Sequence, residues 1–509
     1  MKSIFLFYKF LFFNRKKSNY KNLNEDKILL VELYNIKATI LSFSLFTTAY
    51  KKLYGCRLIG YFPGFQSKKK KTKNFIFNLF SFFNFFGLYK SFGVNEFIFP
   101  TTNSLNLSKI KRLSRYLLKK IKNKKDILKL KIEGILIGDI IYDTYLREKD
   151  VITIDIKSKD FKFFFEKSVA LFFYWHSYLQ NKKIRGVVVS HSVYLTALPA
   201  RIAIQLNKKA FAVAYHSVFQ LTKKEPLVWG GFREYPKEFN SLSKFKQKKS
   251  ILEAKKLLGK RFKGEKDHLY KISNSINTQT FLKNKKNKTS VLKKNNKIKV
   301  LIAAHDFTDA VHGMGDMIFE DMYEWIKFLI NFSKKKNYDW YIKLHPAEYD
   351  LNLHKMKNLL KGFKEFVILP NSISHTQLID EGINCALTVF GSIGHEYPYF
   401  GIPVINAGDN PHLGYDFNFH PKNKEEYTKL LNRINKLKIP KNSTKKIHEF
   451  YYMKYMQDYN ILPNITSIEH LNSSIVFRDY VSNKNKKNLK AVNYFKNFIK
   501  TNKRRLIVD

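Results

Sequence analysis

Two short segments of the chain carry side chains that can bind an anion. One contains Lys343, His345 and Pro346, the other contains Gly391 and Ser392, and each directly follows a short apolar run. A short apolar run, a polar turn with glycine and then a helical pattern are typical of a β-α unit in a parallel sheet. Ligands of such sheets bind at the carboxyl ends of the strands. The spacing therefore predicts that both segments contribute to one ligand site.

The residue types at this predicted site suit a phosphate and a sugar. Gly391 lets a ligand approach the backbone, while Ser392, Ile393 and the first N–H groups of the following helix can hold a phosphate. His345 adds a hydrogen-bond donor for the same anion. Glu396, near the start of the helix, is expected to accept hydrogen bonds from ribose hydroxyls. The pattern therefore predicts a nucleotide-sugar site.

Each of these residues also has an ordinary structural interpretation. His345 could stabilise a strand end, Ser392 could cap the helix, and Glu396 could be a solvated helix residue. Lys343 could be an ordinary strand residue, although a cation near a diphosphate or CMP leaving group would stabilise that group. The sequence leaves these alternatives open.

The segment that begins at His305 is rich in side chains that ligate metals. It contains His305, Asp306, Asp309, His312 and Asp316. The spacing of its histidines fits no standard zinc pattern, and the HExxH motif is absent. A metal-dependent hydrolase is therefore disfavoured, and no cofactor is predicted. Because the segment follows the first strand of the second predicted domain, His305 is expected to contact the donor or the acceptor.

These segments resemble the capsule polysaccharide biosynthesis glycosyltransferases of the two-domain GT-B class. That family carries an HP motif and a later segment with Gly-Ser, a glutamate and Gly-x-Pro-Val. The corresponding residues here are His345-Pro346, Gly391-Ser392, Glu396 and Gly401 to Val404. The stretch from Gly134 to Arg147 resembles an acceptor-domain segment of the same family. The resemblance covers most of residues 130–440.

The resemblance implies a glycosyltransferase that moves a sugar from a nucleotide-activated donor to a growing surface glycan of the capsule or lipopolysaccharide type. It also implies catalysis without a metal. An acceptor hydroxyl that attacks an anomeric carbon needs a proton acceptor. The candidates for this catalytic role are Asp139, Asp143, His191 and His216, and the sequence does not choose among them. The two aspartates lie in a segment that is expected to form a strand and then a turn.

Two other functions fit part of the pattern. A polyol-phosphate transferase with a CDP-linked donor shares the HP motif, but a Ser-Ser motif would be expected where this chain has Gly391, Ser392, Ile393 and Gly394. A non-catalytic, GT-B-like membrane assembly protein would keep the fold and the donor site without a working base.

Alternating apolar and helical patterns predict an α/β protein with two Rossmann-like domains. The resemblance implies the GT-B arrangement, in which the two domains face each other across a cleft. Strands are expected at 27–32, 56–61, 185–190 and 210–214 in the first domain, and at 298–304, 366–369, 385–389, 404–406 and in the run that ends at 345 in the second. Helices are expected at 38–53, 195–205, 376–381, 423–436 and from 392 to 400.

The domain boundaries follow from shifts in composition. They are 1–282 for the acceptor-side domain with a basic and aromatic insertion at about 62–130, 283–297 for a Lys/Asn-rich linker, 298–440 for the nucleotide-sugar-binding domain, and 441–509 for C-terminal helices and a basic tail. The tail, from about residue 480 onward, is expected to be loosely ordered.

The composition sets outer limits on the function. With 509 residues, of which 44% are hydrophobic, the chain can form full cores, so global disorder is excluded. The net charge is +51, but lysine is spread along the whole chain and no zinc-finger, RNP or helix-turn-helix pattern appears, so a nucleic-acid partner is disfavoured. An anionic membrane surface is the favoured partner. Two cysteines, Cys56 and Cys385, cannot form a disulfide scaffold, which fits a reducing compartment.

No apolar run reaches the ~20 residues that span a bilayer. Residues 4–13 are apolar apart from Lys9, but the run is too short. Residues 75–89 are rich in phenylalanine, follow Lys68 to Lys71 and place polar residues at helical spacing. This pattern predicts a helix in the membrane interface or, alternatively, a helix of the core. The protein is therefore expected to be cytoplasmic and peripheral on the inner membrane.

Overall fold

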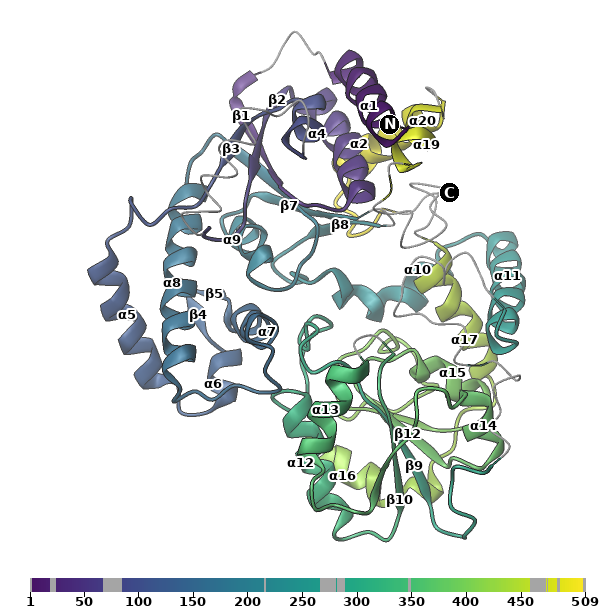
Figure 1. Cartoon of the computed structure of the whole chain (residues 1–509). Helices are drawn as coiled ribbons and strands as arrows, with labels where there is room; N and C mark the ends of the chain where they lie inside the picture. The colour runs from purple at the N-terminus through teal and green to yellow at the C-terminus, as the bar shows by residue number, and fades with distance from the viewer. Residues whose placement is uncertain are drawn as a thin grey trace. The chain divides into compact units, whose positions relative to one another are not determined.

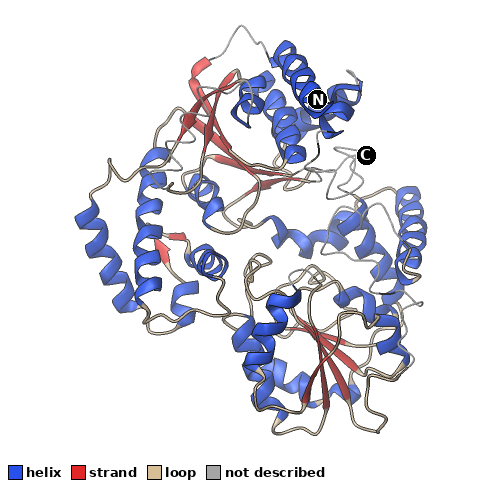
Figure 2. Cartoon of the chain, in the orientation of Figure 1, coloured by secondary structure: helices blue, strands red, loops and turns tan. Residues whose placement is uncertain are grey.

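The computed structural model describes residues 2–18, 24–66, 85–214, 217–265, 281, 289–346, 349–457, 473, 475–482 and 486–506. The chain forms two compact units. The first comprises Met1–Thr144, Asp155–Val228 and Asp458–Asp509, and the second comprises Tyr145–Ile154 and Trp229–Gln457. Figure 1 and Figure 2 show that each unit has its own sheet covered by helices. The predicted α/β class with two Rossmann-like units is confirmed.

The sheet of the first unit has six strands in the order β3-β2-β1-β6-β7-β8. They are β1 (Asn24–Glu32), β2 (Cys56–Tyr61), β3 (Val94–Ile98), β6 (Ile184–Val189), β7 (Lys209–Val213) and β8 (Val218–Leu221). Neighbouring strands are parallel, except that β7 and β8 pair antiparallel. The chain adds β2 and β3 on one side of β1, and β6, β7 and β8 on the other. The strand order therefore reverses between β1 and β6.

Helices from both ends of the chain pack together on one face of this sheet (Figure 1). They are α1 (Lys2–Ser18), α2 (Lys37–Tyr54), α4 (Phe85–Ser91), α19 (Ile475–Ser482) and α20 (Lys486–Lys500). Their apolar side chains form one cluster with Leu29, Val31, Leu58, Val188 and Phe211 of the strands. Elsewhere in the first unit, α9 (Leu198–Gln205) packs against β6, β7 and α8 (Lys159–Leu179). The remaining elements are α5 (Leu107–Lys120), α6 (Lys124–Leu128), β4 (Lys131–Ile132), β5 (Ile135–Leu136) and α7 (Gly138–Lys149), whose residues from Tyr145 on group with the second unit.

The expectation of a loosely ordered C-terminal tail is wrong for its described residues. Helix α20 packs against α2, with Phe495, Phe498 and Ile499 buried in the core cluster. Beyond the helix, the Leu506 N–H donates to the Val218 carbonyl at 2.9 Å, which ties the tail to β8. Phe495, Phe498 and Ile499 recur at helical spacing, but the lysine and asparagine residues between and around them make the apolar pattern hard to recognise in the sequence.

The aromatic stretch at 75–89 is described only at its end. Residues 67–84, and with them Lys68 to Lys71, lie outside the described residues. Within α4, Phe86 and Tyr89 are buried in the core cluster. The described end of the stretch is therefore part of the core. Among the residues that the structure describes, no helix combines the length and the apolar character needed to cross a bilayer.

The sheet of the second unit has five parallel strands in the order β11-β10-β9-β12-β13. They are β9 (Lys299–Ala303), β10 (Asp339–Lys343), β11 (Phe366–Ile368), β12 (Cys385–Thr388) and β13 (Val404–Asn406). All five strands lie within or at the predicted runs. The strand order reverses between β9 and β12, and ligands of open α/β sheets bind at such a reversal, beyond the carboxyl ends of the strands.

Some helices of the second unit begin where a side-chain cap accepts from one of their first N–H groups. The Asp321 side chain accepts from the Glu324 N–H at 2.9 Å and begins α12, and Asn423 accepts from Glu426 at the same distance and begins α16. The helices are α10 (Tyr235–Asn240), α11 (Lys244–Phe262), α12 (Met322–Ser333), α13 (Tyr349–Leu359), α14 (His375–Asp380), α15 (Ile393–Tyr399), α16 (Lys424–Asn432) and α17 (Ser443–Tyr451).

The observed units divide the chain differently from the predicted boundaries. Helices α10 and α11 group with the second unit, and residues 458–509 return to the first. Within the predicted linker, residues 283–288 lie outside the described residues, and Leu292 is buried against the second sheet. The Glu381 carboxylate accepts from the Val291 and Leu292 N–H groups at 2.9 and 2.7 Å. The described end of that linker is therefore held by the second unit.

Candidate functional site

Three strand ends of the second sheet bring together residues that the sequence singled out. His305 follows β9, His345 follows β10, and Phe390 and Gly391 follow β12. The His305 ring stacks on His345 with 5.6 Å between centroids and an interplanar angle of 20°. It also packs against Phe390 at 4.1 Å. The cluster lies at the reversal of the strand order, where a ligand of this sheet would bind.

Gly391 brings bare backbone to this cluster. A Cβ at this position would lie 2.8 Å from Thr388 Oγ1 and 3.6 Å from His305 Nε2. The Thr388 hydroxyl accepts from the Gly391 N–H at 3.2 Å and donates to the Ala303 carbonyl at 3.3 Å. These bonds fix the turn after β12 against the end of β9. A side chain at 391 would push on this turn, so glycine is needed for close packing rather than for an unusual φ.

The environment of His305 keeps its imidazole neutral. Burial, with a smaller contribution from the adjacent His345, lowers the pKa of His305 to about 3. At pH 7 the ring therefore has one N–H donor and one acceptor nitrogen. His345 is partly exposed. The pair can offer hydrogen bonds to an anion without a permanent positive charge on His305.

Ser392 and Ile393 begin the short helix α15 next to the cluster. Ser392 has helical φ and ψ of −59° and −24°, and its side chain makes no capping hydrogen bond. It is partly exposed, whereas the Ile393 side chain is buried in the core behind the turn. Helix α15 has seven residues and contains Pro398. So short a helix sums few peptide dipoles, so the expected contribution of its N-terminus to anion binding is small.

The structure does not support a role for Lys343 at the leaving group. Its ammonium donates to the Ile373 carbonyl at 2.7 Å and to the Asn371 carbonyl at 3.4 Å. The residue is 6% exposed, and burial lowers its pKa to about 8. The side chain therefore holds the loop after β11 and is not directed to the strand-end cluster.

The predicted ribose contact of Glu396 is likewise not supported. The Arg261 guanidinium of α11 donates from Nε to Glu396 Oε1 at 2.5 Å, and its Nη2 contacts the same oxygen. Glu396 is 1% exposed and Arg261 is 2% exposed. The two charges are withdrawn from solvent and satisfy each other, so Glu396 joins α15 to α11. The sequence carried no signal for this pair, because its members lie 135 positions apart.

His395 of α15 and His412 are both buried, and neither was assigned to the site from the sequence. His395 Nδ1 and His412 Nε2 share a hydrogen bond of 3.2 Å. A Cβ on Gly394 would lie 2.5 Å from the His412 ring, so glycine at 394 makes room for that imidazole. Burial is the main cause that lowers the pKa of both rings well below the usual value. The pair supports the helix that follows Ser392.

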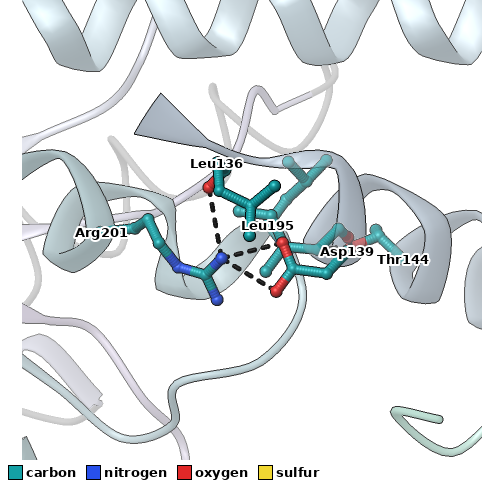
Figure 3. A network of polar contacts seen from close by, with 6 residues as sticks. Leu136, Asp139, Thr144, Leu195 and Arg201 are labelled. Carbon is teal, nitrogen blue, oxygen red and sulfur yellow. Dashed lines mark hydrogen bonds and ion pairs between the residues drawn. The ribbon is translucent and has the colours of Figure 1, made fainter. Parts of the chain in front are cut away.

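In the first unit, Asp139 lies in the first turn of α7 and not in the predicted turn after a strand. Figure 3 shows its carboxylate facing Arg201 of α9, whose Nη1 donates to both carboxylate oxygens at 2.8 Å and to the Leu136 carbonyl at 3.2 Å. Arg201 is buried. This ion pair anchors α7, and it competes with the proposed use of Asp139 as a base.

The other base candidates differ in their exposure. Asp143 lies on the same helix and is 3% exposed. His191 follows β6, is partly exposed, and shares a hydrogen bond of 2.9 Å between its Nε2 and the Tyr34 hydroxyl. His216 lies outside the described residues.

Sequence reasoning missed Glu32, which ends β1 beside β6, although its place at the end of a predicted strand was a signal.

The chain matches no protein-family model and no curated protein sequence. Similar solved structures include KpsC, a beta Kdo 2,4 transferase of Thermosulfurimonas dismutans, with 14% identity over 57% of this chain and 88% of that chain and a TM-score of 0.35. A glycosyltransferase from Rickettsia africae is 12% identical over 95% and 100% of the two chains, with a TM-score of 0.27. UDP-GlcNAc 2-epimerase from Neisseria meningitidis is 11% identical over 90% and 100%, with a TM-score of 0.21. At these scores the similarity supports no assignment of function.

Proposed function

We propose that the chain is a glycosyltransferase of the GT-B type that transfers a sugar from a nucleotide-activated donor to a surface glycan. One observation carries the proposal: His305, His345, Phe390 and Gly391 converge at the strand-order reversal of the second sheet. This is the position at which open α/β sheets bind nucleotides. The residue types fit a phosphate, because imidazole N–H groups and a close backbone can donate to its oxygens.

The donor phosphate would lie against His345 and the Gly391-Ser392 turn. His305, held neutral, would donate a hydrogen bond or orient His345 through the stacked rings. Phe390 offers an apolar surface beside them. Donors that are already in position when negative charge develops on the leaving phosphate lower the barrier to sugar transfer. In this proposal the acceptor belongs to the first unit.

The experiment is a thermal-unfolding panel with CMP, CDP, UDP and GDP. A nucleotide present at ~100 times its dissociation constant should stabilise the protein by ~2.7 kcal/mol. Stabilisation by CDP together with turnover of a CDP-linked polyol would favour a polyol-phosphate transferase. Binding without any turnover would favour a non-catalytic assembly protein. If no nucleotide shifts the unfolding temperature, the proposed function is rejected.

An anionic membrane surface is the proposed partner of α1. Phe5, Lys9 and Phe12 share one face of this helix at spacings of four and three residues, and Phe5 and Phe12 are 65% and 67% exposed. Aromatic rings around a lysine suit the boundary between lipid headgroups and acyl chains.

Replacing Phe5 and Phe12 by serine should weaken binding to phosphatidylglycerol vesicles by roughly tenfold or more, because two apolar rings leave the interface. Co-sedimentation measures the effect, and Phe245→Ser, at an exposed position of α11, is the control. Equal sedimentation of the wild type and the double variant would contradict the proposal that α1 binds an anionic membrane.

A further inference from the structure

The first unit has its own gathering of polar side chains at the reversal of its strand order. Glu32 is the last residue of β1, and Ser190 and His191 directly follow β6. These two strands are the neighbours between which the order reverses. The same rule that places a ligand at the second sheet therefore points to this edge of the first sheet. Nothing in the proposed donor site uses these residues.

Glu32 links the two strand ends. Its Oε2 accepts a hydrogen bond of 2.5 Å from the Ser190 N–H, and the residue is 2% exposed. A buried carboxylate is costly unless its lone pairs are used, and backbone donors are the usual partners. Ser190 stabilises the charged carboxylate through both its N–H and its side chain, and a carboxylate has further lone pairs that can accept a proton.

Tyr34 and His191 form the outer part of the same edge. The Tyr34 hydroxyl and His191 Nε2 share a hydrogen bond of 2.9 Å, and both residues are partly exposed. Tyr89 of α4 fixes the chain that follows β1. Its hydroxyl accepts from the Tyr34 N–H at 2.8 Å and lies 3.1 Å from the Glu32 carbonyl oxygen. The phenol and the imidazole are therefore fixed, and both can exchange hydrogen bonds with a sugar hydroxyl.

The surroundings of Glu32 make its carboxylate a stronger base than an ordinary glutamate. Burial raises its pKa to about 7, and hydrogen bonding from Ser190 opposes the shift. The titratable groups that interact with its charge are Tyr61 of β2 and Tyr89 of α4, and burial raises the pKa of both tyrosines, which stay neutral. A general base works best when its pKa lies near the operating pH.

We propose that this edge of the first sheet is a hydroxyl-binding site in which Tyr34 and His191 hold the acceptor sugar and Glu32 accepts its proton. The inference rests on the proposed function. In the step, the acceptor O–H bond breaks and its proton passes to the Glu32 carboxylate. The acceptor oxygen bonds to the anomeric carbon, and the bond from that carbon to the donor phosphate breaks with its electron pair on the phosphate. Asp139 is the weaker candidate, because Arg201 donates to both of its oxygens.

The test compares Glu32→Gln with Glu96→Gln. Glutamine keeps the shape of the side chain and can still accept from the Ser190 N–H, but it cannot take up a proton. Glu96 is an exposed glutamate of β3 in the same sheet and is the matched control. Nucleotide release from CMP-, UDP- and GDP-linked sugars, with methyl glycosides as acceptors, is measured from pH 5 to 9 beside nucleotide affinity.

The expected result is a 100-fold or greater loss of turnover in Glu32→Gln, with nucleotide affinity within twofold of the wild type. Wild-type turnover should rise with pH up to about 7, and this rise should be absent in Glu32→Gln. The pH at which Glu32 titrates is checked by unfolding. The unfolded chain ionises this carboxyl more readily than the folded chain does. As the pH rises from 5 to 8, the denaturation midpoint of the wild type should therefore fall relative to that of Glu32→Gln.

Three outcomes decide the inference. Loss of turnover and of the pH dependence in Glu32→Gln, with Glu96→Gln unchanged, supports it. Wild-type turnover in a folded, nucleotide-binding Glu32→Gln protein, or an unchanged pH profile, overturns it and leaves the donor site standing. A wild-type chain that binds none of the nucleotides rejects the proposed function and, with it, this inference.

Discussion

Replacing Glu396 by alanine is expected to lower the free energy of unfolding by about 3–5 kcal/mol, because it leaves the Arg261 guanidinium buried without its partner. Both side chains are almost completely excluded from solvent, and they join α15 to α11 within the second unit. Denaturant unfolding at pH 7 measures the loss. The variant also separates two roles: a carboxylate that joins two helices is needed for stability, whereas one that binds ribose is needed for nucleotide affinity.

Two further variants make this result specific to the buried pair. Glu425→Gln removes the partner of Lys429 in an exposed pair on α16 and should change stability little. The double variant Arg261→Met with Glu396→Leu replaces both charges by apolar groups and should recover much of the lost stability. A loss below about 1 kcal/mol in Glu396→Ala would contradict the structural role.

Acidification is expected to destabilise the second unit strongly. Burial lowers the pKa of His375, His395 and His412 well below the usual value of 6.5. Between the folded and unfolded pKa values only the unfolded chain binds the proton, so stability falls as the pH falls below about 6.5. One pH unit costs about 1.4 kcal/mol for each such histidine, so the three together cost roughly 4 kcal/mol at pH 5.5. Denaturant unfolding at pH 7.5, 6.5 and 5.5 measures the slope.

A matched pair of variants assigns the slope to these groups. His395→Gln removes one buried imidazole and should flatten the dependence of stability on pH, whatever its effect at pH 7.5. His354 is exposed on α13 and bonds only to Asn358 of the same helix among the contacts described for it, so His354→Gln should leave the slope as it is. Equal stability at pH 7.5 and 5.5 in the wild type would show that the histidines titrate normally.

The central strands of both sheets could be predicted because they are short apolar runs bounded by polar turns. Strands β3 and β8 were missed, since Val94–Ile98 and Val218–Leu221 are short and contain polar residues. Helix α20 was missed because its buried face is carried by a few apolar residues within a Lys/Asn-rich segment. In such cases the tertiary partner, α2, decides the structure, and the local pattern carries little information.

The candidate site could likewise be predicted only in part. His305, His345 and Gly391 could be placed from the sequence, because each directly follows a predictable strand and parallel strands end on one edge. The orientation of Lys343 and Glu396 could not, since their partners are the Ile373 carbonyl and Arg261, which are remote in sequence. The place of Glu32 at the reversal of the strand order could not be predicted either, because the sequence does not show that β6 lies beside β1.

The most direct test of the donor site is calorimetric titration of His345→Ala with the nucleotide that stabilises the wild type most. If His345 donates to the nucleotide phosphate, affinity should fall by roughly 1.5–3 kcal/mol, the range for a hydrogen bond to a charged group, with little change in unfolding temperature. His354→Ala, on the exposed face of α13, should bind as the wild type does. A folded His345→Ala protein that binds the nucleotide with wild-type affinity would contradict the assignment of the strand-end cluster as the donor site.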